Sequence, residues 1–494
     1  MLTAARGSAL QDLLFAHGVE FPCGGRGRCK GCRIRVIAGS LGITDEDRQR
    51  LAHSELGEGW RLGCQARVEG DLKLELAQWE TPILSDDSIF GFKPKKGLGI
   101  AIDLGTTTIV AQLLDLWTGN VLGVRSALNA QARHGADIMS RVEFATSAQG
   151  RQRLQQLVRE QIRNIVVELL SEVASTITGG GGRLSSIVVV GNTVMHHLFC
   201  GIDIEPLSHF PFEPVSSGLQ ILRTSDLGWS IPGDSSLHFL PCLGGFVGSD
   251  VLAGILACKL QERDSLAVLI DLGTNGEIVI GNRERLLCAS TAAGPAFEGA
   301  RISMGMRAAY GAISRVHLEA GQLRCHVLGD IPPRGICGSG LVDAAAVALD
   351  LHLIKTNGRL AQGDSLLLSS PVSLNQWDIR ELQLAKGAIA AGVEILLNQL
   401  AADKGDVKQV FLAGAFGNYI NYVSASRIGL LDFAPEIVTP AGNTALLGAK
   451  LALFDLDEHD GAYPQVLAKT QHFSLKEDPH FHEVFVEKMG FPER

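Results

Sequence analysis

The feature that most constrains the fold is a short pattern that occurs twice, first from Ala101 to Val110 and again from Val268 to Ile280. Each copy is an aliphatic run ending in Asp-Leu-Gly-Thr, followed by a second aliphatic run. Aliphatic and β-branched residues favour strands, and the glycine permits a tight turn, so each copy predicts an antiparallel hairpin. Two copies so far apart in the chain indicate a duplicated domain with one hairpin in each half.

The turn of each hairpin offers groups that bind phosphate. Backbone N–H groups and threonine hydroxyls can contact an anion there, and the aspartate is placed to hold a hydrated Mg²⁺. For one copy alone, an ordinary hairpin with an aspartate at its edge is an equal alternative. The repetition favours two acidic hairpins, at Asp103 and Asp271, that hold the phosphates of a nucleotide from both sides.

A third motif, from Val410 to Asn418, is an apolar strand that runs into Gly414 and Gly417. Glycines at this point let a flat base or ribose approach the backbone closely. Two acidic hairpins followed by such a strand resemble the actin/Hsp70/sugar-kinase (ASKHA) superfamily of two-lobed ATPases, over about residues 99–455. That family usually has a Gly-Gly pair in its adenosine motif, whereas Ala415 follows Gly414 here.

Four cysteines dominate the N-terminal segment: Cys23, Cys29 and Cys32 with C-x5-C-x2-C spacing, and Cys64 further along. Plant-type [2Fe–2S] ferredoxins have C-x4-C-x2-C and a distant fourth cysteine, so this loop is one residue longer. A zinc site more often shows two C-x2-C pairs, and a disulfide framework suits an oxidising compartment. The spacing therefore favours a [2Fe–2S] cluster, with zinc and disulfides as the alternatives.

The residues around these cysteines predict the elements of a β-grasp ferredoxin. We expect a short helix from Leu10 to Val19, strands over 33–38 and 71–76, and a capped helix from Thr44 to Leu56. The segment before Cys23 is short for the full opening of such a fold. Either the first strand is absent or the true start lies upstream of Met1.

These patterns predict an α+β and α/β chain with four parts. They are a ferredoxin-like domain over 1–78, a polar and proline-bearing linker over 79–98, one ASKHA lobe over 99–265, and a second lobe with a C-terminal tail over 266–494. The linker is either an ordinary connection or a tether that lets the cluster move between electron partners.

Several residues outside the main motifs are open to two interpretations. His196 and His197 are adjacent, so on a helix they face different sides, and we interpret them as packing residues. Asp250 either caps the helix 251–260 or faces the phosphates. Glu277 is either part of the site or solvated. Asp378 and Glu381 resemble a capping box for a helix from Ile379. The remaining cysteines, at 200, 242, 258, 288, 325 and 337, have no ligand spacing and are expected in the core.

Composition excludes some classes of function. With 494 residues, 46% hydrophobic content and 57 glycines, the chain suits several α/β domains. A net charge of −9 argues against nucleic acid as a partner. No apolar run is long enough to span a membrane, and the first residues lack the apolar segment of a secretion signal. We therefore expect a cytoplasmic protein, where thiols stay reduced.

The four motifs in one chain, from Cys-Gly-Gly-Arg-Gly-Arg-Cys-Lys-Gly-Cys to Leu-Ala-Gly-Ala-Phe-Gly-Asn, are similar to the ATP-dependent reductive activators of corrinoid enzymes. The closing segment, from Glu477 to Pro492, also resembles that family. The resemblance implies a homodimer that hydrolyses ATP to reduce a Co(II) corrinoid protein, or a corrinoid-dependent methyltransferase, to Co(I), supplied with electrons by a reductase or ferredoxin. An acceptor 100–200 mV below the cluster would cost roughly 2–5 kcal/mol per electron.

The resemblance also implies roles for individual residues. Cys23, Cys29, Cys32 and Cys64 would hold the cluster, and Asp103 and Asp271 would position Mg²⁺ and the attacking water. The phosphates would be held by Gly105, Thr106, Thr107, Gly273, Thr274 and Asn275, and adenosine would face Gly414 and Gly417.

The chain departs from this family in two respects. The small domain that commonly precedes the lobes is missing, because the linker leads directly to Asp103, and the ferredoxin start is short. The alternatives are an ATP-driven donor to another low-potential enzyme, such as a dehydratase, and a small-molecule kinase with a redox-sensing domain.

Overall fold

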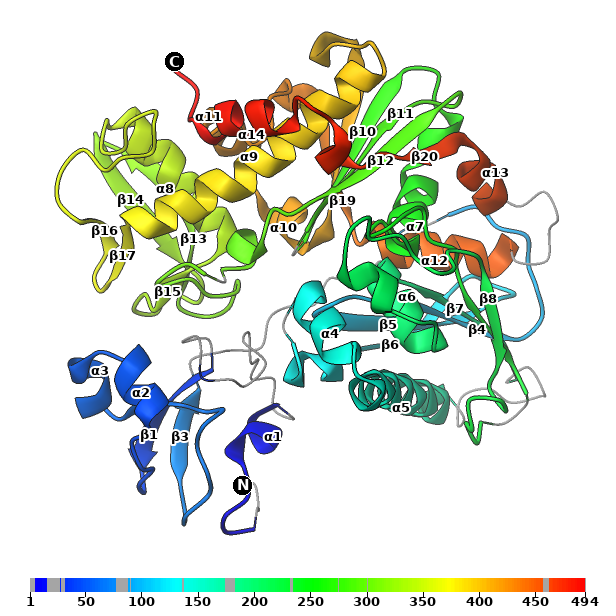
Figure 1. The fold of residues 1–494 in the computed structure, drawn as a ribbon, viewed down its shortest axis with the longest axis horizontal. Helices are drawn as coiled ribbons and strands as arrows, with labels where there is room; N and C mark the ends of the chain where they lie inside the picture. Colours follow the sequence, from blue (N-terminus) through cyan, green and yellow to red (C-terminus); the bar gives the residue numbers. More distant parts are fainter. Residues whose placement is uncertain are drawn as a thin grey trace.

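The computed structural model describes residues 5–15, 27, 32–76, 88, 90–135, 137–173, 183–231, 234–273, 275–299, 301–455 and 462–493. Figure 1 shows a small N-terminal domain in blue beside two larger lobes. We call the lobe built on the sheet of β4 lobe I, and the lobe built on the sheet of β10 lobe II. Within the described residues, no helix is both long and apolar enough to cross a membrane.

The N-terminal domain is a three-stranded sheet with short helices around a small apolar core. In spatial order its strands are β2 (Trp60–Leu62), β1 (Arg33–Ala38) and β3 (Lys73–Leu76), and its helices are α1 (Leu10–Phe15), α2 (Asp45–Arg50) and α3 (His53–Gly57). Thr44 caps α2 as expected, with Asp47 as its capping-box partner. The single helix expected up to Leu56 is wrong, because the chain leaves helical geometry at Leu51 before α3 begins.

Lobe I confirms the first predicted hairpin. Its six-stranded sheet has the order β6 (Val121–Leu128), β5 (Thr108–Asp115), β4 (Leu98–Leu104), β7 (Leu184–Val190), β9 (Ser236–Phe239) and β8 (Gln220–Arg223). Its helices are α4 (Ile138–Ala145), α5 (Ala148–Val173), α6 (Thr193–Cys200) and α7 (Ser249–Cys258). The apolar stripe of α5 packs into the core of this lobe, as its helical spacing predicts.

Lobe II repeats the order of five of the six strands, and its sixth strand lies at the opposite end of the sheet. Its sheet is β19 (Val438–Gly442), β18 (Val407–Ala413), β10 (Leu266–Leu272), β11 (Gly276–Gly281), β12 (Leu286–Thr291) and β20 (Thr470–His472). In both lobes the central strand pairs antiparallel with the next strand of the hairpin and parallel with a later strand. The duplication predicted from the two Asp-Leu-Gly-Thr turns is therefore confirmed at the level of topology.

An additional layer, at the left of Figure 1, extends lobe II. Its strands are β13 (Ala312–Glu319), β14 (Gln322–Val327), β15 (Gly335–Ile336), β16 (Ser365–Ser369) and β17 (Val372–Asn375), and its helices are α8 (Gly338–Asp350) and α9 (Gln376–Gln399). Short helices α10 (Gly414–Tyr419) and α11 (Tyr422–Arg427) follow β18. The capping box expected to start α9 at Ile379 is displaced, since Asn375 is the N-cap and Asp378 is its partner in the first turn.

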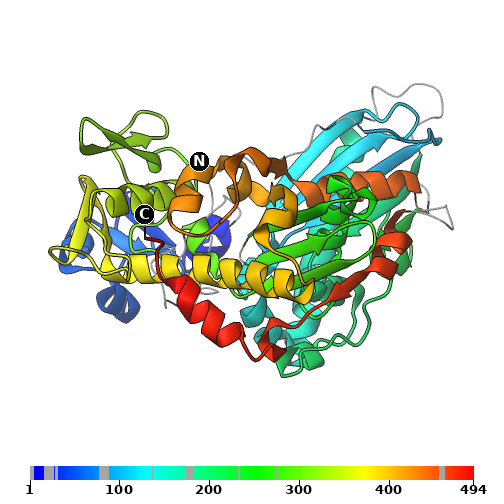
Figure 2. The ribbon, with the colours of Figure 1, turned by 90° about the horizontal axis from the view of Figure 1, so that it is seen from above.

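The C-terminal segment ends in a helix that packs along α9, as Figure 2 shows for the red and yellow helices. It contains α12 (Thr444–Asp455), α13 (Ala462–Lys469) and α14 (Phe481–Met489). Lys386 of α9 is buried, donates a hydrogen bond to the carbonyl of Gly490, and lies 5.3 Å from the ring centre of Phe491. The tail is thus an integral part of lobe II.

The two lobes meet through α7 and α12, which share one apolar core with both sheets. Small residues allow these helices to approach closely. A Cβ atom at Gly448 of α12 would lie 2.1 Å from the carbonyl oxygen of Ala253 in α7. The helices whose N-termini begin near the two acidic hairpins therefore also form the junction between the lobes.

The N-terminal domain contacts both lobes. Leu128, Ala130 and Ala132 of lobe I pack against the apolar core that contains Leu10, Leu14 and Cys32. On the other side, Arg334 of lobe II forms an ion pair with Glu75 of β3, with an N–O distance of 3.5 Å.

Candidate functional site

Four carboxylates from both lobes converge where the lobes meet. Asp103 lies near the end of β4, and Asp271 lies at the corresponding position of β10. Glu277 of β11 is the cross-strand partner of Asp271 in the second hairpin. Asp250 lies in the first turn of α7, whose N-cap is Gly248. The expectation that Asp250 caps this helix is therefore wrong, and its alternative, a side chain that faces the phosphates, stays a prediction.

The electrostatics of this group favour a bound cation. Burial raises the pKa of Asp103 to about 7, and the charge of Asp271 adds to the effect while a hydrogen bond from Asn443 opposes it. Burial and the charges of Asp271 and Asp103 raise the pKa of Asp250 to about 7. Burial alone raises the pKa of Asp271 to about 6. A metal ion or a cationic ligand would relieve both the desolvation and the repulsion.

Glu277 is part of this electrostatic group. Burial raises its pKa well above the usual value, and the charges of Asp250 and Asp271 add to the shift. Its carboxylate accepts a long hydrogen bond of 3.5 Å from the hydroxyl of Ser290. Of the two interpretations of this residue, membership of the site is the one that the structure supports.

The first phosphate turn, Gly105 to Thr107, is held in place by three buried side chains. Asn129 donates to the carbonyl oxygen of Gly105 over 2.9 Å, and Arg141 donates to that of Thr106. Asn192, which follows β7 and caps α6, donates to the hydroxyl of Thr106 over 2.8 Å. The carbonyl oxygens of Gly105 and Thr106 thus accept hydrogen bonds from side chains inside lobe I. A turn supported in this way is suited to an ordered ligand.

The second phosphate turn carries Gly273 and Asn275, and the N–H of Gly273 donates to the carbonyl of Asn275 over 3.0 Å. Thr274, predicted for the same turn, lies outside the described residues. This turn adjoins the third motif, because a Cβ atom at Gly414 would lie 2.7 Å from Oδ1 of Asp271. Gly414 has a φ of 80° and lies at the start of α10. The structure therefore brings the predicted second and third motifs together.

Gly417 has a different structural reason to be glycine. Its backbone does not require positive φ, but a Cβ atom would lie 3.0 Å from the carbonyl carbon of Leu412. The absence of a side chain lets α10 pack against β18. Its contact with adenosine stays a prediction.

Asn443 is a site residue that our sequence reasoning did not identify. It precedes α12, accepts a hydrogen bond from the N–H of Leu446 as a helix cap does, and donates to the carboxylate of Asp103 over 3.1 Å. The asparagine before a helical run, in Gly442-Asn-Thr, signals the cap. Nothing local in the sequence signals the contact with Asp103.

The cluster site is described in part. Cys32 and Cys64 lie close together, because Arg33 of β1 pairs with Leu62 of β2, and the N–H of Gly63 donates to the carbonyl of Cys32 over 2.9 Å. Cys23 and Cys29 lie outside the described residues. The two described cysteines fit the predicted ligand set, since the strand pairing brings the distant fourth cysteine to the C-x2-C end of the loop.

The histidines and the other cysteines are packing residues, as expected. His196 and His197 are fully buried in α6, and burial lowers the pKa of both. Cys242, Cys258, Cys288 and Cys337 are buried in the lobes, whereas Cys200 and Cys325, also expected in the core, are only half-buried. Burial raises the pKa of the first three thiols, which keeps them protonated and unsuited to bind a metal.

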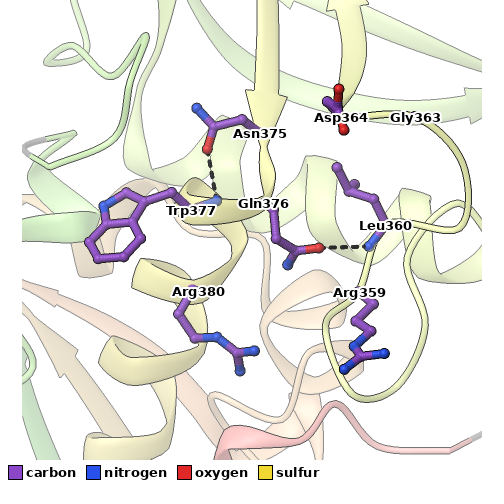
Figure 3. Close-up of a pocket in the computed structure, with 8 residues that line it drawn as sticks. All are labelled: Arg359, Leu360, Gly363, Asp364, Asn375, Gln376, Trp377 and Arg380. Carbon is purple, nitrogen blue, oxygen red and sulfur yellow. Dashed lines mark hydrogen bonds between the residues drawn. The ribbon is translucent and has the colours of Figure 1, made fainter.

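A separate cavity of about 500 Å³ opens in the additional layer of lobe II (Figure 3). Arg359 and Arg380 line it together with Trp377 near the start of α9. None of the four carboxylates lines this cavity. It is therefore distinct from the site between the hairpins.

Three known families match successive parts of the chain. The 2Fe-2S iron–sulfur cluster binding domain matches residues 2–69, the RACo middle region matches 98–263, and the C-terminal domain of RACo, described as the ASKHA domain, matches 265–494. The corrinoid activation enzyme RamQ of Eubacterium limosum is 34% identical over 439 residues, which are 82% of this chain and 73% of that protein. This chain belongs to the family of corrinoid activation enzymes.

Two further members support the assignment. The [Co(II) methylated amine-specific corrinoid protein] reductase of Methanosarcina barkeri is 27% identical over 71% of this chain and 69% of its own length. The solved structure of a reductive activator for a corrinoid, iron–sulfur protein superimposes with a TM-score of 0.70 and 26% identity, covering 100% of this chain and 97% of that one. The family confirms the predicted combination of a [2Fe–2S] ferredoxin-like domain with an ATP-binding ASKHA fold.

The expected absence of a middle domain finds no support in these matches. The middle region of the family begins at Leu98 and coincides with the sheet and helices of lobe I. What we interpreted as the first ASKHA lobe is thus the segment that the family description calls the middle region.

Proposed function

We propose that the protein is an ATP-dependent reductive activator that returns a corrinoid protein from Co(II) to Co(I). One observation carries the proposal: the domain that bears the predicted cluster cysteines is packed directly against a two-lobed fold in which the facing hairpins and helix α7 together supply four carboxylates. The relatives, named as a corrinoid activation enzyme and a corrinoid protein reductase, support the same activity.

The nucleotide site is proposed at the carboxylates. Asp103 and Asp271 would hold Mg²⁺ through its water shell and orient the attacking water, and Asp250 and Glu277 would add negative charge around the ion. No group of three His, Cys, Asp or Glu side chains among the described residues is arranged to hold a metal alone. That fits Mg²⁺ in nucleotide sites, where one or two carboxylates act together with phosphates and water.

The phosphates would lie against the two hairpin turns. Gly105, Thr106 and Thr107 on one side and Gly273, Thr274 and Asn275 on the other would donate to them. The helix that begins at Ser249 directs its N-terminus toward the same region, where its dipole favours an anion. Adenosine is proposed beside Gly414 and Gly417.

The cluster is proposed to be held by Cys23, Cys29, Cys32 and Cys64. A [2Fe–2S] group in this position supplies a one-electron reductant with a potential near −400 mV for the plant type. The contribution of the protein is to bury Cys32 in the core of the domain and to fix Cys64 beside it.

The remaining partners follow from this assignment. The electron donor would be a reductase or a second ferredoxin, the protein would act as a homodimer in the cytoplasm, and the acceptor would be a corrinoid protein or a corrinoid-dependent methyltransferase. The relatives support the corrinoid partner.

The test is spectroscopic. The reduced protein is mixed anaerobically with a Co(II) corrinoid protein, and Co(I) absorbance is followed with and without Mg–ATP. Asp271→Asn is expected to lower the ATP-dependent rate by about a hundredfold or more while the visible spectrum of the cluster is unchanged. Asp226→Asn, at an exposed position of lobe I, is the matched control and should keep the full rate.

Two outcomes would contradict the proposal. If Asp271→Asn kept the full ATP-dependent rate, the carboxylate of Asp271 would not be part of the nucleotide site. A protein that reduces a dehydratase, or phosphorylates a small molecule, but does not respond to any corrinoid protein would assign a different activity to the same fold.

A further inference from the structure

The segment that supports the first phosphate turn also forms the surface on which the iron–sulfur domain rests. Asn129 is fully buried between β6 and the 3₁₀ helix η1 (Ala130–Arg133). Its side-chain amide donates to the carbonyl of Gly105 over 2.9 Å, and its backbone N–H donates to the carbonyl of Thr107 over 2.8 Å. One residue is therefore bonded to both ends of the turn.

The same residue fixes η1. The side-chain oxygen of Asn129 accepts the N–H of Gln131 over 3.0 Å, which caps the 3₁₀ helix. Gln161 of α5 holds the segment from the other side, accepting from the N–H of Ala130 and donating to the carbonyl of Leu128. The segment at η1 is therefore hydrogen-bonded both to the phosphate turn, through Asn129, and to α5, through Gln161.

The outer side of η1 belongs to the core of the other domain. Ala132 is 7% exposed and packs in the apolar cluster formed by Leu10, Leu14 and Cys32. Asn129 and the short helix η1 thus connect the phosphate turn to the domain that carries Cys32. The second contact of that domain, Glu75 with Arg334, is with lobe II.

We propose that η1, positioned by Asn129, couples nucleotide binding at the Gly105–Thr107 turn to the docking of the iron–sulfur domain. The inference deepens the proposed function, on which it rests. A domain that touches both lobes restrains the angle between them. A nucleotide bound by hairpins of both lobes draws them together and breaks this bridge, so the iron–sulfur domain is released toward its electron acceptor.

Linkage makes the proposal quantitative. If nucleotide weakens docking by some factor, then docking weakens nucleotide binding by the same factor. A variant that cannot dock must therefore bind nucleotide more tightly than the wild-type protein, although the altered residue does not touch the nucleotide.

The experiment uses the full-length protein with its cluster and a non-hydrolysable ATP analogue with Mg²⁺. Ala132→Glu places a charge in the interface between the domains, and Ala148→Glu places the same charge at an exposed position of lobe I as the control. Hydrogen–deuterium exchange of the peptide around Leu10–Leu14 reports docking, and calorimetry reports affinity.

In the wild-type protein and in Ala148→Glu, the analogue should raise exchange in this peptide. In Ala132→Glu, exchange should be high without nucleotide and unchanged by it, and the analogue should bind at least about fivefold more tightly. Asn129→Ser keeps a capping oxygen, but its shorter side chain does not reach the carbonyl of Gly105, so this variant should bind the analogue with a much smaller exchange response.

The coupling is overturned if the wild-type protein binds the analogue with no change in exchange, or if Ala132→Glu keeps the full response. A complete response in Asn129→Ser would remove Asn129 from the pathway. None of these measurements involves a corrinoid protein. Failure of the proposed function, which is a failure to form Co(I), is therefore distinguished from failure of the coupling.

Discussion

The side-chain amide of Asn443 donates a hydrogen bond of 3.1 Å to the carboxylate of Asp103, joining two residues that are 340 positions apart in the chain. Asn443 directly precedes α12, which forms the junction between the lobes, and Asp103 lies near the end of the first strand of the acidic hairpin in lobe I. The contact links the orientation of the interlobe helix to the charge state of a carboxylate in the proposed nucleotide site.

Replacing Asn443 should affect both stability and nucleotide binding. In Asn443→Ala the cap of α12 is lost, which costs about 1 kcal/mol of unfolding free energy. The pKa of Asp103 should also rise, because the hydrogen bond that now lowers it is gone. The affinity for Mg–nucleotide should then fall most at pH 6–7. Denaturant unfolding and calorimetry at several pH values measure the two effects.

The matched control for this change is Asn421→Ala, which removes the cap of α11 through the same kind of side-chain contact. It should lose a similar amount of stability and no nucleotide affinity. Equal losses of affinity in both variants would show that Asn443 acts only as a cap.

Asp250→Asn should stabilise the nucleotide-free protein in Mg²⁺-free buffer, and more so at higher pH. The pKa of Asp250 rises from 3.8 to about 7 on folding. Its protonated form stabilises the fold fully below pH 4, and this contribution is lost as pH rises through 7. The asparagine does not ionise, so the gain in unfolding free energy should grow between pH 4 and 7, by at most about 1.4 kcal/mol per pH unit.

Thermal or denaturant unfolding from pH 4 to 8 measures this gain, with Asp226→Asn as an exposed aspartate whose profile should follow that of the wild-type protein. A pH-independent difference for Asp250→Asn would show that its carboxylate does not become protonated on folding.

Gly414→Ala should impair nucleotide binding beyond its effect on stability. The φ of 80° strains any side chain by about 1–2 kcal/mol, and the added methyl would lie 2.7 Å from Oδ1 of Asp271. Gly228→Ala imposes a similar strain at a φ of 69°, with nothing within 4 Å of the new atom. Both variants should lose stability, but only Gly414→Ala should lose affinity for Mg–nucleotide. Equal affinities of the two variants for Mg–nucleotide would show that Gly414 is not part of the nucleotide site.

Gly448→Ala should destabilise the junction of the lobes. The new methyl would lie 2.1 Å from the carbonyl oxygen of Ala253, and because the clash is with backbone, α7 and α12 must move apart. We expect a loss of about 1–3 kcal/mol or more in denaturant unfolding, not rescued by Ala253→Gly. Gly405→Ala, where an added Cβ meets nothing within 4 Å, should be nearly neutral. Rescue by Ala253→Gly would show that side-chain crowding, not backbone contact, limits the approach of the helices.

The parts of the fold that the sequence predicted are those governed by local chemistry. The aliphatic runs around Asp103 and Asp271 specified hairpins, because alternation of strand and turn residues acts over a few positions. The stripe of α5 and the cap at Thr44 were visible for the same reason. The start of α9 was predicted wrongly, because its N-cap is Asn375 and not Asp378. Asp378 is the capping-box partner in the first turn, and its carboxylate also accepts hydrogen bonds from the backbone N–H and the hydroxyl of Ser303.

By itself, the sequence determined the duplicated hairpins, the cysteine spacing and the family that they resemble, since each depends on residues close together in the chain. Only the tertiary structure decided that Asp250 and Glu277 join Asp103 and Asp271, that Asn443 reaches across the lobes, and that Asn129 lies between the phosphate turn and the iron–sulfur domain. These relationships arise when separate sheets and helices pack together. No spacing along the chain specifies which buried side chains will then share one environment.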